Sequence, residues 1–309
     1  LFDGSPHGPA AREPAERPAP ASYIPQWLQL LLSAHLSADE WPALLERAPV
    51  DARANVARAS RDQLIGEFEN AVPTALSPWG LRLPPDSKVD DHPAYQAGLI
   101  EVQDEGSQLI ALACAPTDGM RLLDLCAGAG GKSLALAAAA PRAEIIASDT
   151  NRARLTQLPP RADRAGAGNI AIRLLDGGRE SAQLADLEGQ CDVVLVDAPC
   201  SGSGTWRRNP EGRWRLTPER LDKLVKLQAR LLDIAVPLVK PGGALVYATC
   251  SIIRAEGADQ ARNFLGRHSS WIGQDVAFDG GRDDGPGRLL TPAHDATDGF
   301  FVARFVRPC

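Results

Sequence analysis

The feature that most constrains this chain is a short apolar run followed by a glycine-rich turn, at residues 121–133 (RLLDLCAGAGGKS). The apolar run ends in Asp124, the turn holds three glycines, and an alanine- and leucine-rich stretch follows at residues 134–140. Because alanine and leucine favour the helix, the segment predicts a strand, a glycine loop and a helix in that order. This order is typical of the first unit of a nucleotide-binding α/β sheet, in which the loop lets the backbone approach a ligand closely.

Three kinds of ligand are known for loops of this general type, and two of them do not fit the residues. A phosphate loop of the Walker type needs a glycine five positions before its Gly-Lys-Ser, where this chain has Cys126. A dinucleotide fingerprint needs a third glycine three positions after the second, where this chain has Ser133. The remaining interpretation is the donor loop of S-adenosylmethionine (SAM) methyltransferases. A tight glycine turn that serves packing alone stays open as the alternative.

Near-continuous apolar runs alternate with helical stretches over the rest of the chain. Runs of this kind indicate parallel strands that are covered by helices on both faces. A last run at residues 299–306 predicts a further strand, which we expect to be antiparallel. The predicted fold class is therefore α/β, a doubly wound, mostly parallel sheet of the SAM-methyltransferase (Rossmann-like) type, preceded by a small α/β subdomain. The strand candidates lie at residues 121–126, 144–149, 170–175, 191–197 and 243–249.

Three domains are expected along the chain. Residues 1–22 form a proline-rich linker, residues 23–92 a small α/β module, and residues 93–309 the main sheet domain. Within the module, Ser37 and Glu40 have the spacing of a capping box. The arginines of the module indicate either a solvated face or a contact with RNA, and both interpretations stay open. These arginines are Arg47, Arg53, Arg58 and Arg61.

Composition excludes some classes of protein. No run approaches the roughly 18 apolar residues of a membrane span, and no apolar core of a secretory signal is present. The six cysteines form no CxxC pair, which argues for a reducing cytoplasm and against a disulfide framework or a zinc site. We therefore expect a cytoplasmic protein with no bound metal and no membrane partner and, because no dimer seam is visible, a monomer. The net charge of −6 means that any nucleic-acid surface must be local.

Aspartates stand at the ends of the first four predicted strands. In a doubly wound sheet, ligands bind beyond the carboxyl ends of the strands, near the point where the strand order reverses. Asp149 is placed to accept both hydroxyls of a ribose, and Asp176 to accept a hydrogen bond from an adenine amino group. A single aspartate at a strand end is more often a helix cap or a turn residue, but four in register favour ligand binding. The four are Asp124, Asp149, Asp176 and Asp197.

Two cysteines follow predicted strands that would be neighbours in the sheet. Cys200 follows Asp197-Ala-Pro and Cys250 follows Tyr-Ala-Thr, so both thiols should face one cleft beside a methyl donor. A thiolate suits one reaction in particular, because its addition to C6 of a pyrimidine makes the weakly nucleophilic C5 able to take a methyl group. Asp197 would hydrogen-bond N3 of a cytosine during that attack. The cysteines predicted to be buried and inert are Cys114, Cys126 and Cys191.

On these motifs, residues 93–309 resemble the Sun/Fmu family of SAM-dependent RNA cytosine-C5 methyltransferases. The shared motifs are CAGAGGK at 126–132, Asp149, Asp176, DAPCSGSG at 197–204, YATCS at 247–251 and DGFFVARF at 298–305. The resemblance implies that Cys250 is the nucleophile and that Cys200 assists release of the product. It also implies that residues 23–92 are the family's N-terminal RNA-binding subdomain. The implied donor-site residues are Cys126, Ala127, Gly128, Ala129, Gly130, Gly131, Lys132, Asp149, Asp176 and Asp197.

Two positions depart from the pattern of the family. Ala129 stands where many members have proline, and Gly257 follows Glu256 where asparagine is frequent. The first change is expected to be harmless, whereas the second puts one loop hydrogen bond in question. Bacterial members that act on ribosomal RNA also carry a helical domain of the NusB type upstream, so we expect this sequence to be a shorter member or a truncated form.

A local basic segment lies between residues 205 and 230. It contains eight arginines and lysines against three acidic residues, in a chain whose net charge is −6. Arginines bind phosphates and aromatic rings stack on unpaired bases, which is how single-stranded RNA is usually bound. The alternative is an amphipathic helix at 218–239 with a solvated charged face, which accounts for the lysines. The predicted RNA contacts lie in the loop before that helix and are Trp206, Arg207, Arg208, Arg213 and Trp214.

The predicted function is SAM-dependent methylation of C5 of cytosine in RNA, with ribosomal RNA as the expected partner, through a covalent adduct between Cys250 and C6. A tRNA substrate is the first alternative. A DNA cytosine methyltransferase would use the Pro-Cys pair as its nucleophile, and the second cysteine argues against it. A non-catalytic RNA-binding factor in ribosome assembly and a thiol–disulfide switch between Cys200 and Cys250 stay open as well.

Overall fold

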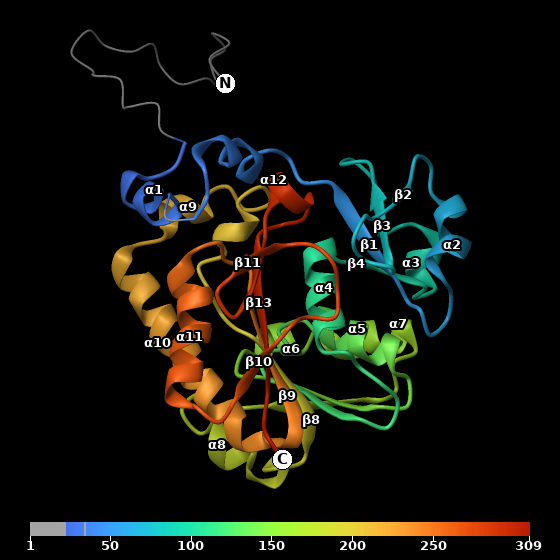
Figure 1. Cartoon of the computed structure of the whole chain (residues 1–309). Helices are drawn as coiled ribbons and strands as arrows, with labels where there is room; N and C mark the ends of the chain where they lie inside the picture. The colour runs from blue at the N-terminus through green and yellow to red at the C-terminus, as the bar shows by residue number, and fades with distance from the viewer. Residues whose placement is uncertain (1–22, 34) are drawn as a thin grey trace, which may run out of the picture.

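Two β-sheets organise the protein, and the larger one carries the predicted site (Figure 1). The computed structural model describes residues 23–33 and 35–309, so the expected linker at residues 1–22 lies outside the described residues. The larger sheet has the strand order β11-β12-β13-β9-β8-β5-β6-β7, with β10 paired to β13. Its strands are β5 (Arg121–Asp124), β6 (Glu144–Asp149), β7 (Ile170–Leu174), β8 (Cys191–Asp197), β9 (Val239–Thr249), β10 (Ile272–Gln274), β11 (Arg282–Asp284), β12 (Gly287–Leu290) and β13 (Phe300–Val306).

The order of the strands fixes where a ligand site belongs. The strands from β5 to β9 pair in parallel, and β13 pairs antiparallel with β9. The chain runs from β5 outward to β7 on one side and from β8 outward to β9 on the other, so the strand order reverses between β5 and β8. This arrangement confirms the predicted doubly wound fold and its antiparallel last strand. The carboxyl ends of β5 and β8 are where such sheets bind their ligands.

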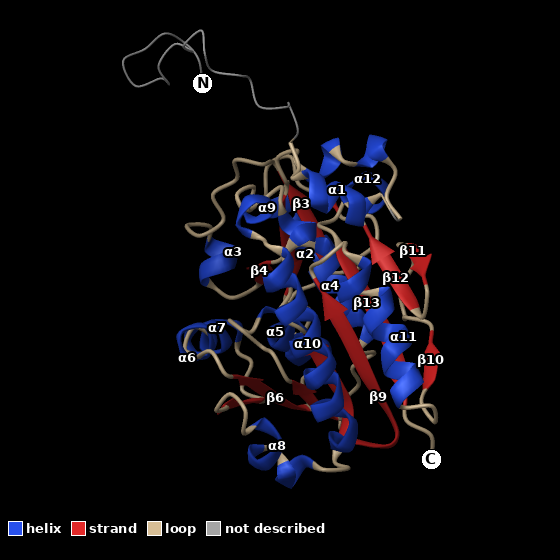
Figure 2. Ribbon diagram, turned by 90° about the vertical axis from the view of Figure 1, so that its left-hand side faces the viewer, coloured by secondary structure: helices blue, strands red, loops and turns tan. Residues whose placement is uncertain are grey.

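Helices cover both faces of the larger sheet (Figure 2). Helices α4 (Glu105–Ala113) and α5 (Gly131–Ala139) pack on one face, and α10 (Pro218–Ala235) and α11 (Ala258–Arg267) pack on the other, which makes two separate apolar cores. The strands between them are apolar on both faces, as their near-continuous runs predicted. None of the helices in the described residues has the length and apolar character needed to cross a bilayer. The shorter helices are α6 (Arg152–Leu155), α7 (Leu158–Ala165), α8 (Glu180–Gln183), α9 (Gly212–Arg215) and α12 (Pro292–Asp295).

The smaller sheet is antiparallel and has the strand order β2-β3-β1-β4. Strand β4 pairs with β1 in a register that places Ala52 opposite Val102. The expected domain boundary between residues 92 and 93 therefore cuts this sheet, because the open edge of β1 is completed by a segment that lies beyond the boundary. The elements are β1 (Val50–Ala54), β2 (Val72–Pro73), β3 (Gly80–Leu83) and β4 (Ile100–Val102), with the short helices α2 (Arg61–Leu64) and α3 (Pro93–Gln96).

The segment before the small sheet packs on the main domain. Helix α1 (Gln26–Leu32) places its apolar face in one buried cluster with Trp206 and Ile252. The predicted capping box at Ser37 and Glu40 is present, but it opens a single 3-10 turn instead of an α-helix. Residues 23–92 therefore do not form one unit. Their first part packs on the main domain, and their second part contributes β1, β2 and β3 to the small sheet.

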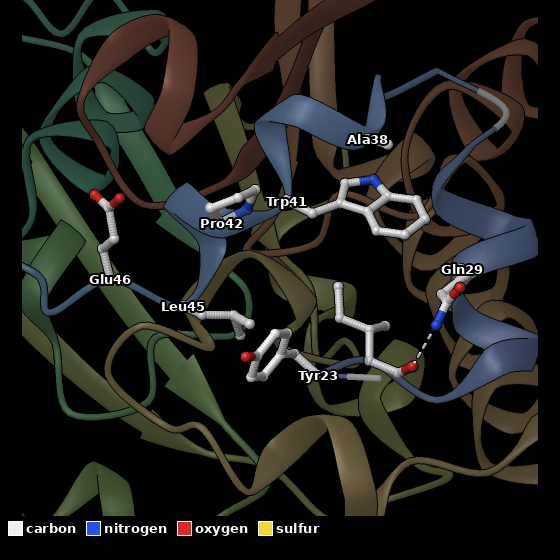
Figure 3. A pocket seen from close by; sticks show the side chains of 8 residues that line it. Tyr23, Gln29, Ala38, Trp41, Pro42, Leu45 and Glu46 are labelled. Atoms are coloured by element: carbon white, nitrogen blue, oxygen red, sulfur yellow. Dashed lines mark hydrogen bonds between the residues drawn. The ribbon is translucent and has the colours of Figure 1, made fainter. Parts of the chain in front are cut away.

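A cavity of about 570 Å³ lies among these N-terminal turns (Figure 3). Tyr23, Trp41, Pro42 and Leu45 give it a largely apolar lining, and Glu46 stands at its margin. Among the described residues, those that line it include neither a cysteine nor an aspartate. The cavity therefore lacks the reactive groups that the sequence predicts for the site.

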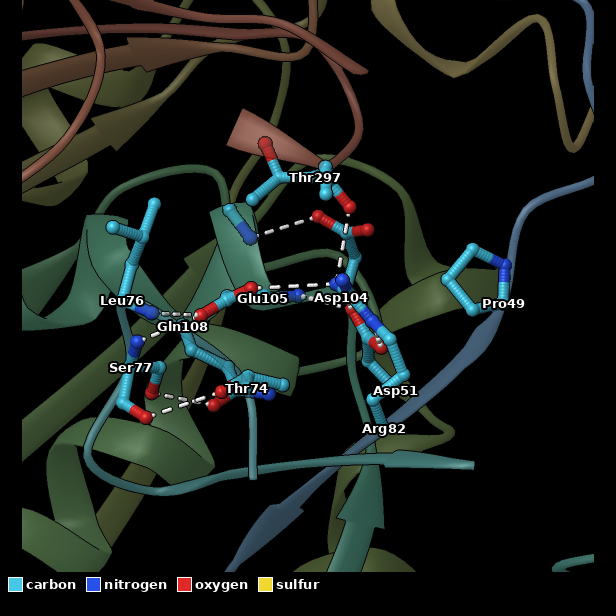
Figure 4. Close-up of polar contacts among 12 residues, drawn as sticks. Pro49, Asp51, Thr74, Leu76, Ser77, Arg82, Asp104, Glu105, Gln108 and Thr297 are labelled. Carbon is cyan, nitrogen blue, oxygen red and sulfur yellow. Dashed lines mark hydrogen bonds and ion pairs between the residues drawn. The ribbon is translucent and has the colours of Figure 1, made fainter. Parts of the chain in front are cut away.

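Buried carboxylates join the two sheets at the start of α4 (Figure 4). Glu105 accepts hydrogen bonds from the backbone N–H groups of Leu76 and Ser77, at 2.5 and 2.8 Å. Arg82 of β3 bonds Asp51 of β1 at 2.8 Å and lies 3.3 Å from Glu105. Because each of these acids meets an arginine or a backbone donor, the contacts hold the small sheet against the first helix of the main domain.

Candidate active site

The glycine loop after β5 has a backbone that favours glycine at two positions. Gly128 and Gly130 have φ angles of +57° and +83°, in the left-handed region. A Cβ atom on Gly130 would lie 2.2 Å from the Leu158 side chain, and one on Gly128 would lie 2.5 Å from the Arg154 guanidinium. The loop therefore passes close to its neighbours, and α5 begins at Gly131 with its first N–H groups at the carboxyl edge of the sheet.

The strand-end aspartates differ in their surroundings. Asp149 accepts hydrogen bonds from the backbone N–H groups of Gly128 and Asn151, both at 2.7 Å, so its carboxylate fixes the glycine loop. Asp124 is 1% exposed and accepts a hydrogen bond from Ser133 at 2.7 Å. Burial raises the pKa of the Asp124 carboxyl to about 7. Asp124 therefore supports the start of α5 and does not face a ligand.

Asp176 is exposed at the surface after β7. It exchanges two hydrogen bonds with Gln183, at 2.7 and 2.9 Å. Its neighbour Leu175 lines the cavity described below, but Asp176 itself does not. The role expected for Asp176, acceptance of a hydrogen bond from an adenine amino group, stays a prediction.

Asp197 at the end of β8 is paired with a lysine. Its carboxylate lies 2.7 Å from Nζ of Lys132, in the first turn of α5. Burial by itself lowers the pKa of the Lys132 ammonium, but the charge and the hydrogen bond of Asp197, with smaller effects of Cys250 and Asp124, raise it overall. Lys132 is therefore charged, and its ammonium holds the Asp197 carboxylate in place.

The two predicted cysteines face each other. Strands β8 and β9 are parallel neighbours with Asp197 opposite Ala248, and the turns after them bring Sγ of Cys200 to 3.3 Å from Sγ of Cys250. Both are free thiols. The hydrogen bond to Cys250 and burial raise the pKa of the Cys200 thiol well above its ordinary value. Cys200 is therefore protonated at neutral pH, and the role of Cys250 as the nucleophile of the pair stays a prediction.

These groups line one cavity of about 480 Å³. The cavity runs from Leu125 and Cys126, at the start of the glycine loop, to the two thiols, so a methyl donor and an acceptor base would meet inside it. Its lining also includes Arg154, Glu180 and Arg220, which no motif in the sequence signalled. The predicted residues that meet there are Cys126, Asp149, Asp197, Cys200 and Cys250.

The remaining cysteines follow the prediction with one exception. Cys114 and Cys191 are fully buried, and burial raises the pKa of each thiol to about 12, so both are inert. Cys126 differs because it lines the cavity, although burial also raises the pKa of its thiol well above the ordinary value. The expectation that Cys126 is only a core residue is therefore wrong.

Two of the predicted RNA contacts, Trp206 and Arg207, are wrong because their side chains are held inside the protein, whereas Arg208 pairs with aspartates but keeps an exposed side chain, so its RNA contact stays a prediction. Trp206 is 1% exposed and belongs to the apolar cluster that covers α1. Arg207 bonds Asp298 at 2.5 Å, and its side chain is 7% exposed. Arg208 bonds Asp298 at 2.6 Å and Asp104 at 3.0 Å. These buried aspartates attract the two guanidinium groups inward, so the three side chains hold the loop in place.

The other two predicted RNA contacts remain available. Trp214 is 56% exposed, and the guanidinium of Arg213 lies 5.5 Å from the centre of its ring. In the small module, Arg53 fits neither of its two interpretations, because it is 2% exposed and bonds Gln103 at 2.7 Å. The exposed Trp214 ring is therefore the clearest stacking surface that this loop offers.

Comparison with known proteins agrees with this geometry. The family described as 16S rRNA methyltransferase RsmB/F matches residues 111–306. The chain belongs to this methyltransferase family. Membership confirms the resemblance to the Sun/Fmu group that the motifs indicated.

Curated relatives of this RsmB/F member extend the match to most of the chain. The ribosomal RNA small subunit methyltransferases B of Salmonella arizonae and Salmonella paratyphi B are each 35% identical to it over 292 residues, which cover 92% of this chain. The chain spans 66% of the length of these relatives.

Two solved structures are similar to this protein over most of its chain. The protein solved as PH0851 superposes with a TM-score of 0.85 at 30% identity, covering 94% of this chain and 70% of that one. NSun6 from Pyrococcus horikoshii, solved with SFG, has a TM-score of 0.81 at 18% identity and covers 92% of this chain and 98% of its own. The second likeness concerns the fold alone. Together they confirm the predicted fold class of a mixed α/β protein with a large, mostly parallel sheet.

Proposed function

We propose that this protein is a SAM-dependent methyltransferase that modifies C5 of cytosine in RNA, with ribosomal RNA as its substrate. The observation that carries the proposal is the pair of free thiols 3.3 Å apart, in the same cavity as Asp197 and Asp149. The names of the family and of the curated relatives, which specify 16S or small-subunit ribosomal RNA, support this class of substrate over tRNA. The same relatives support action in the cytoplasm, and we propose a monomer.

The residues beside the cavity fit the methyl donor. Gly128 and Gly130 present backbone without side chains, and the start of α5 directs N–H groups toward the same edge. Asp149 is held at the end of β6 by two backbone N–H groups and still lines the cavity, where it would accept the ribose hydroxyls. SAM, when bound there, supplies an electrophilic methyl group. The implied donor set also includes Cys126, Ala127, Ala129, Gly131, Lys132, Asp176 and Asp197.

The protein groups then divide the work on the cytosine. Sγ of Cys250 forms a bond to C6, which makes C5 nucleophilic enough to take the methyl group. As Sγ bonds C6, the proton of the Cys250 thiol passes to N3, and the Asp197 carboxylate, oriented by Lys132 at 2.7 Å, accepts a hydrogen bond from this N3–H as negative charge moves into the ring. After transfer, a base takes the C5 proton, the electrons of the C5–H bond restore the C5–C6 double bond, and the electron pair of the S–C6 bond returns to Sγ of Cys250, which regains its proton from N3. Cys200, protonated and 3.3 Å from Cys250, assists that release.

The RNA must deliver an unstacked base to this cavity. We propose that the small sheet and the exposed Trp214 contact the strand beside the target. Support for this part comes from the exposure of Trp214 and from its place in the loop that continues the Cys200 turn.

The proposal is tested by methyl transfer from labelled SAM. A small-subunit ribosomal RNA transcript, a tRNA transcript and single-stranded DNA of the ribosomal sequence are offered to wild type and to Cys250→Ser. We expect label in ribosomal RNA from wild type alone. Equal labelling of DNA would favour a DNA enzyme, and RNA binding without any transfer would favour a non-catalytic assembly factor.

A further inference from the structure

The two cysteine turns are joined by a buried carboxylate that the mechanism above does not use. Glu256 lies in the 3-10 turn Arg254–Glu256, shortly after Cys250, and it is 0% exposed. Its Oε1 accepts the backbone N–H of Ser201 at 2.8 Å, and its Oε2 accepts the hydroxyls of Ser201 at 2.5 Å and Ser251 at 2.6 Å. Ser201 is next to Cys200 and Ser251 is next to Cys250. One carboxylate therefore bonds the neighbour of each thiol.

A second contact fixes the other side of Cys200. Gln228 of α10, which is 0% exposed, donates from Nε2 to Oε1 of Glu256 at 3.0 Å and to the carbonyl of Pro199 at 2.9 Å. Pro199 precedes Cys200, and Ser201 follows it. The backbone on both sides of Cys200 is therefore connected to the same carboxylate.

Cys250 depends less on these contacts. It follows β9 directly, and that strand pairs with β8 on one side and β13 on the other. Its carbonyl also accepts the N–H of Gly204 at 3.0 Å. Loss of the carboxylate should therefore displace Cys200 more than Cys250.

The carboxylate cannot be replaced by a neutral group without loss. Glu256 receives four hydrogen bonds, all from neutral donors, and a carboxylate has only acceptor sites to offer. An amide at this position would keep its oxygen toward the two N–H donors of Ser201 and Gln228. Its NH₂ group would then face the hydroxyls of Ser201 and Ser251, which would have to turn and accept. Glu256→Gln should therefore weaken this set of hydrogen bonds, and Glu256→Ala should remove it.

We propose that Glu256 is a positioning residue, which holds the Cys200 turn against Cys250 and on which release of the methylated RNA therefore depends. This inference rests on the proposed function, since release is the step assigned to Cys200. A positioning role of this kind should impair release of the methylated RNA and spare methyl transfer, whereas a loss of stability would impair both steps. Attack and methyl transfer need Cys250, whereas breakage of the S–C6 bond needs both thiols in place.

The first experiment separates these steps. Wild type, Glu256→Gln, Glu256→Ala and Cys200→Ala are compared for single-turnover methyl transfer, for steady-state turnover, and for covalent RNA complex on a denaturing gel. We expect single-turnover transfer to stay within about threefold of wild type and turnover to fall by up to about 10²-fold in Glu256→Ala, as for a misplaced catalytic group. The covalent complex should accumulate in the order wild type, Glu256→Gln, Glu256→Ala.

A matched control shows what mere destabilisation does. Glu105 is equally buried and accepts backbone N–H groups, but it lies at the start of α4 among residues of the small sheet. Glu105→Gln should lower the melting temperature without accumulation of covalent complex. If the Glu256 variants lose single-turnover transfer and turnover in equal proportion, as an unstable protein would, the inference is wrong.

A readout without RNA distinguishes failure of this inference from failure of the proposed function. Diamide takes two hydrogen atoms from a pair of thiols, so that the thiols become a disulfide and the reagent a hydrazine. At 3.3 Å, Cys200 and Cys250 should pair rapidly in wild type and in Glu105→Gln, and several-fold more slowly in Glu256→Ala. The pair is identified by mass spectrometry of the linked peptides. Equal rates in all variants would overturn the positioning role, whether or not wild type methylates RNA.

Discussion

Two regions of this molecule gather charged side chains, and the charges serve different purposes in each. In the cleft at the strand ends, Lys132 pairs with Asp197 beside two thiols, and Asp197 and the thiols line a cavity. In the loop after Cys200, Arg207 and Arg208 turn inward to buried aspartates. A strand end fixes which way a side chain points, whereas a basic loop does not fix whether its arginines meet solvent or an acid. The charged groups of the cleft are therefore placed to act on a substrate, whereas those of the loop stabilise the fold.

The largest effect should come from the cleft. Cys250→Ala removes the sulfur that bonds C6, and we expect methyl transfer to fall by on the order of 10³-fold or more, as when other enzymes lose a nucleophile. Transfer of label from SAM to RNA measures it, and the melting temperature serves as the control for folding. Residual activity within tenfold of wild type would place the nucleophile elsewhere.

The next effect tests the loop. Arg207→Ala leaves Asp298 buried without one of its partners, and breaking a buried pair costs about 3 to 5 kcal/mol. Urea unfolding should show this loss, while the exposed Arg215→Ala, whose pair with Glu211 lies at the surface, should change stability by less than about 1 kcal/mol. Similar stability of the two variants would mean that the pair of Arg207 with Asp298 does not stabilise the fold.

A smaller effect concerns RNA affinity. Trp214→Ala should weaken binding of single-stranded RNA by about 1 to 3 kcal/mol, the contribution of one aromatic stacking partner. Its free energy of unfolding should stay unchanged, because the ring is 56% exposed. Fluorescence anisotropy with a labelled oligonucleotide measures the dissociation constant. Unchanged affinity would remove Trp214 from the RNA surface.

The last expected effect is a pH dependence of stability at Asp124. Its carboxyl has a pKa of about 7 in the folded protein against 3.8 as the reference, so the folded state holds the proton more tightly than the unfolded state. The stability that this group contributes is therefore present below pH 3.8 and is lost as the pH rises to 7, at no more than about 1.4 kcal/mol per pH unit. Asp124→Asn should remove that slope relative to wild type. The same pH dependence of the free energy of unfolding in wild type and Asp124→Asn, measured by urea unfolding from pH 5 to 8, would contradict this prediction.

The larger sheet can be predicted well from the sequence because each of its strands is recognised from a few consecutive residues. Short apolar runs that alternate with helical stretches indicate strands covered on both faces, and the three glycines identify the loop after Asp124. The neighbourhood of Cys200 and Cys250 follows from the strand order alone. The separation of 3.3 Å between the two sulfur atoms and the hydrogen bonds of Glu256 could not be predicted in this way, because they depend on how the two turns pack against each other.

The errors have a common physical origin in long-range pairing. Arg207 looks exposed in the sequence, but Asp104 and Asp298, which hold it, are far away along the chain. Strand β4 was likewise assigned to the wrong side of a boundary, because its pairing with β1 joins residues about fifty positions apart. Asp176 stays open because only a bound donor would show whether its carboxylate turns from Gln183 to a ligand.

Cys250 should form the covalent bond to the RNA, and Cys200 should assist its release. Wild type, Cys200→Ala and Cys250→Ala are incubated with SAM and small-subunit ribosomal RNA transcript, and each mixture is run on a denaturing gel. The geometry predicts a slow-migrating protein–RNA complex with Cys200→Ala and none with Cys250→Ala. A complex trapped by Cys250→Ala would reverse the two roles, and no complex with any variant, together with no methyl transfer by wild type, would contradict the account.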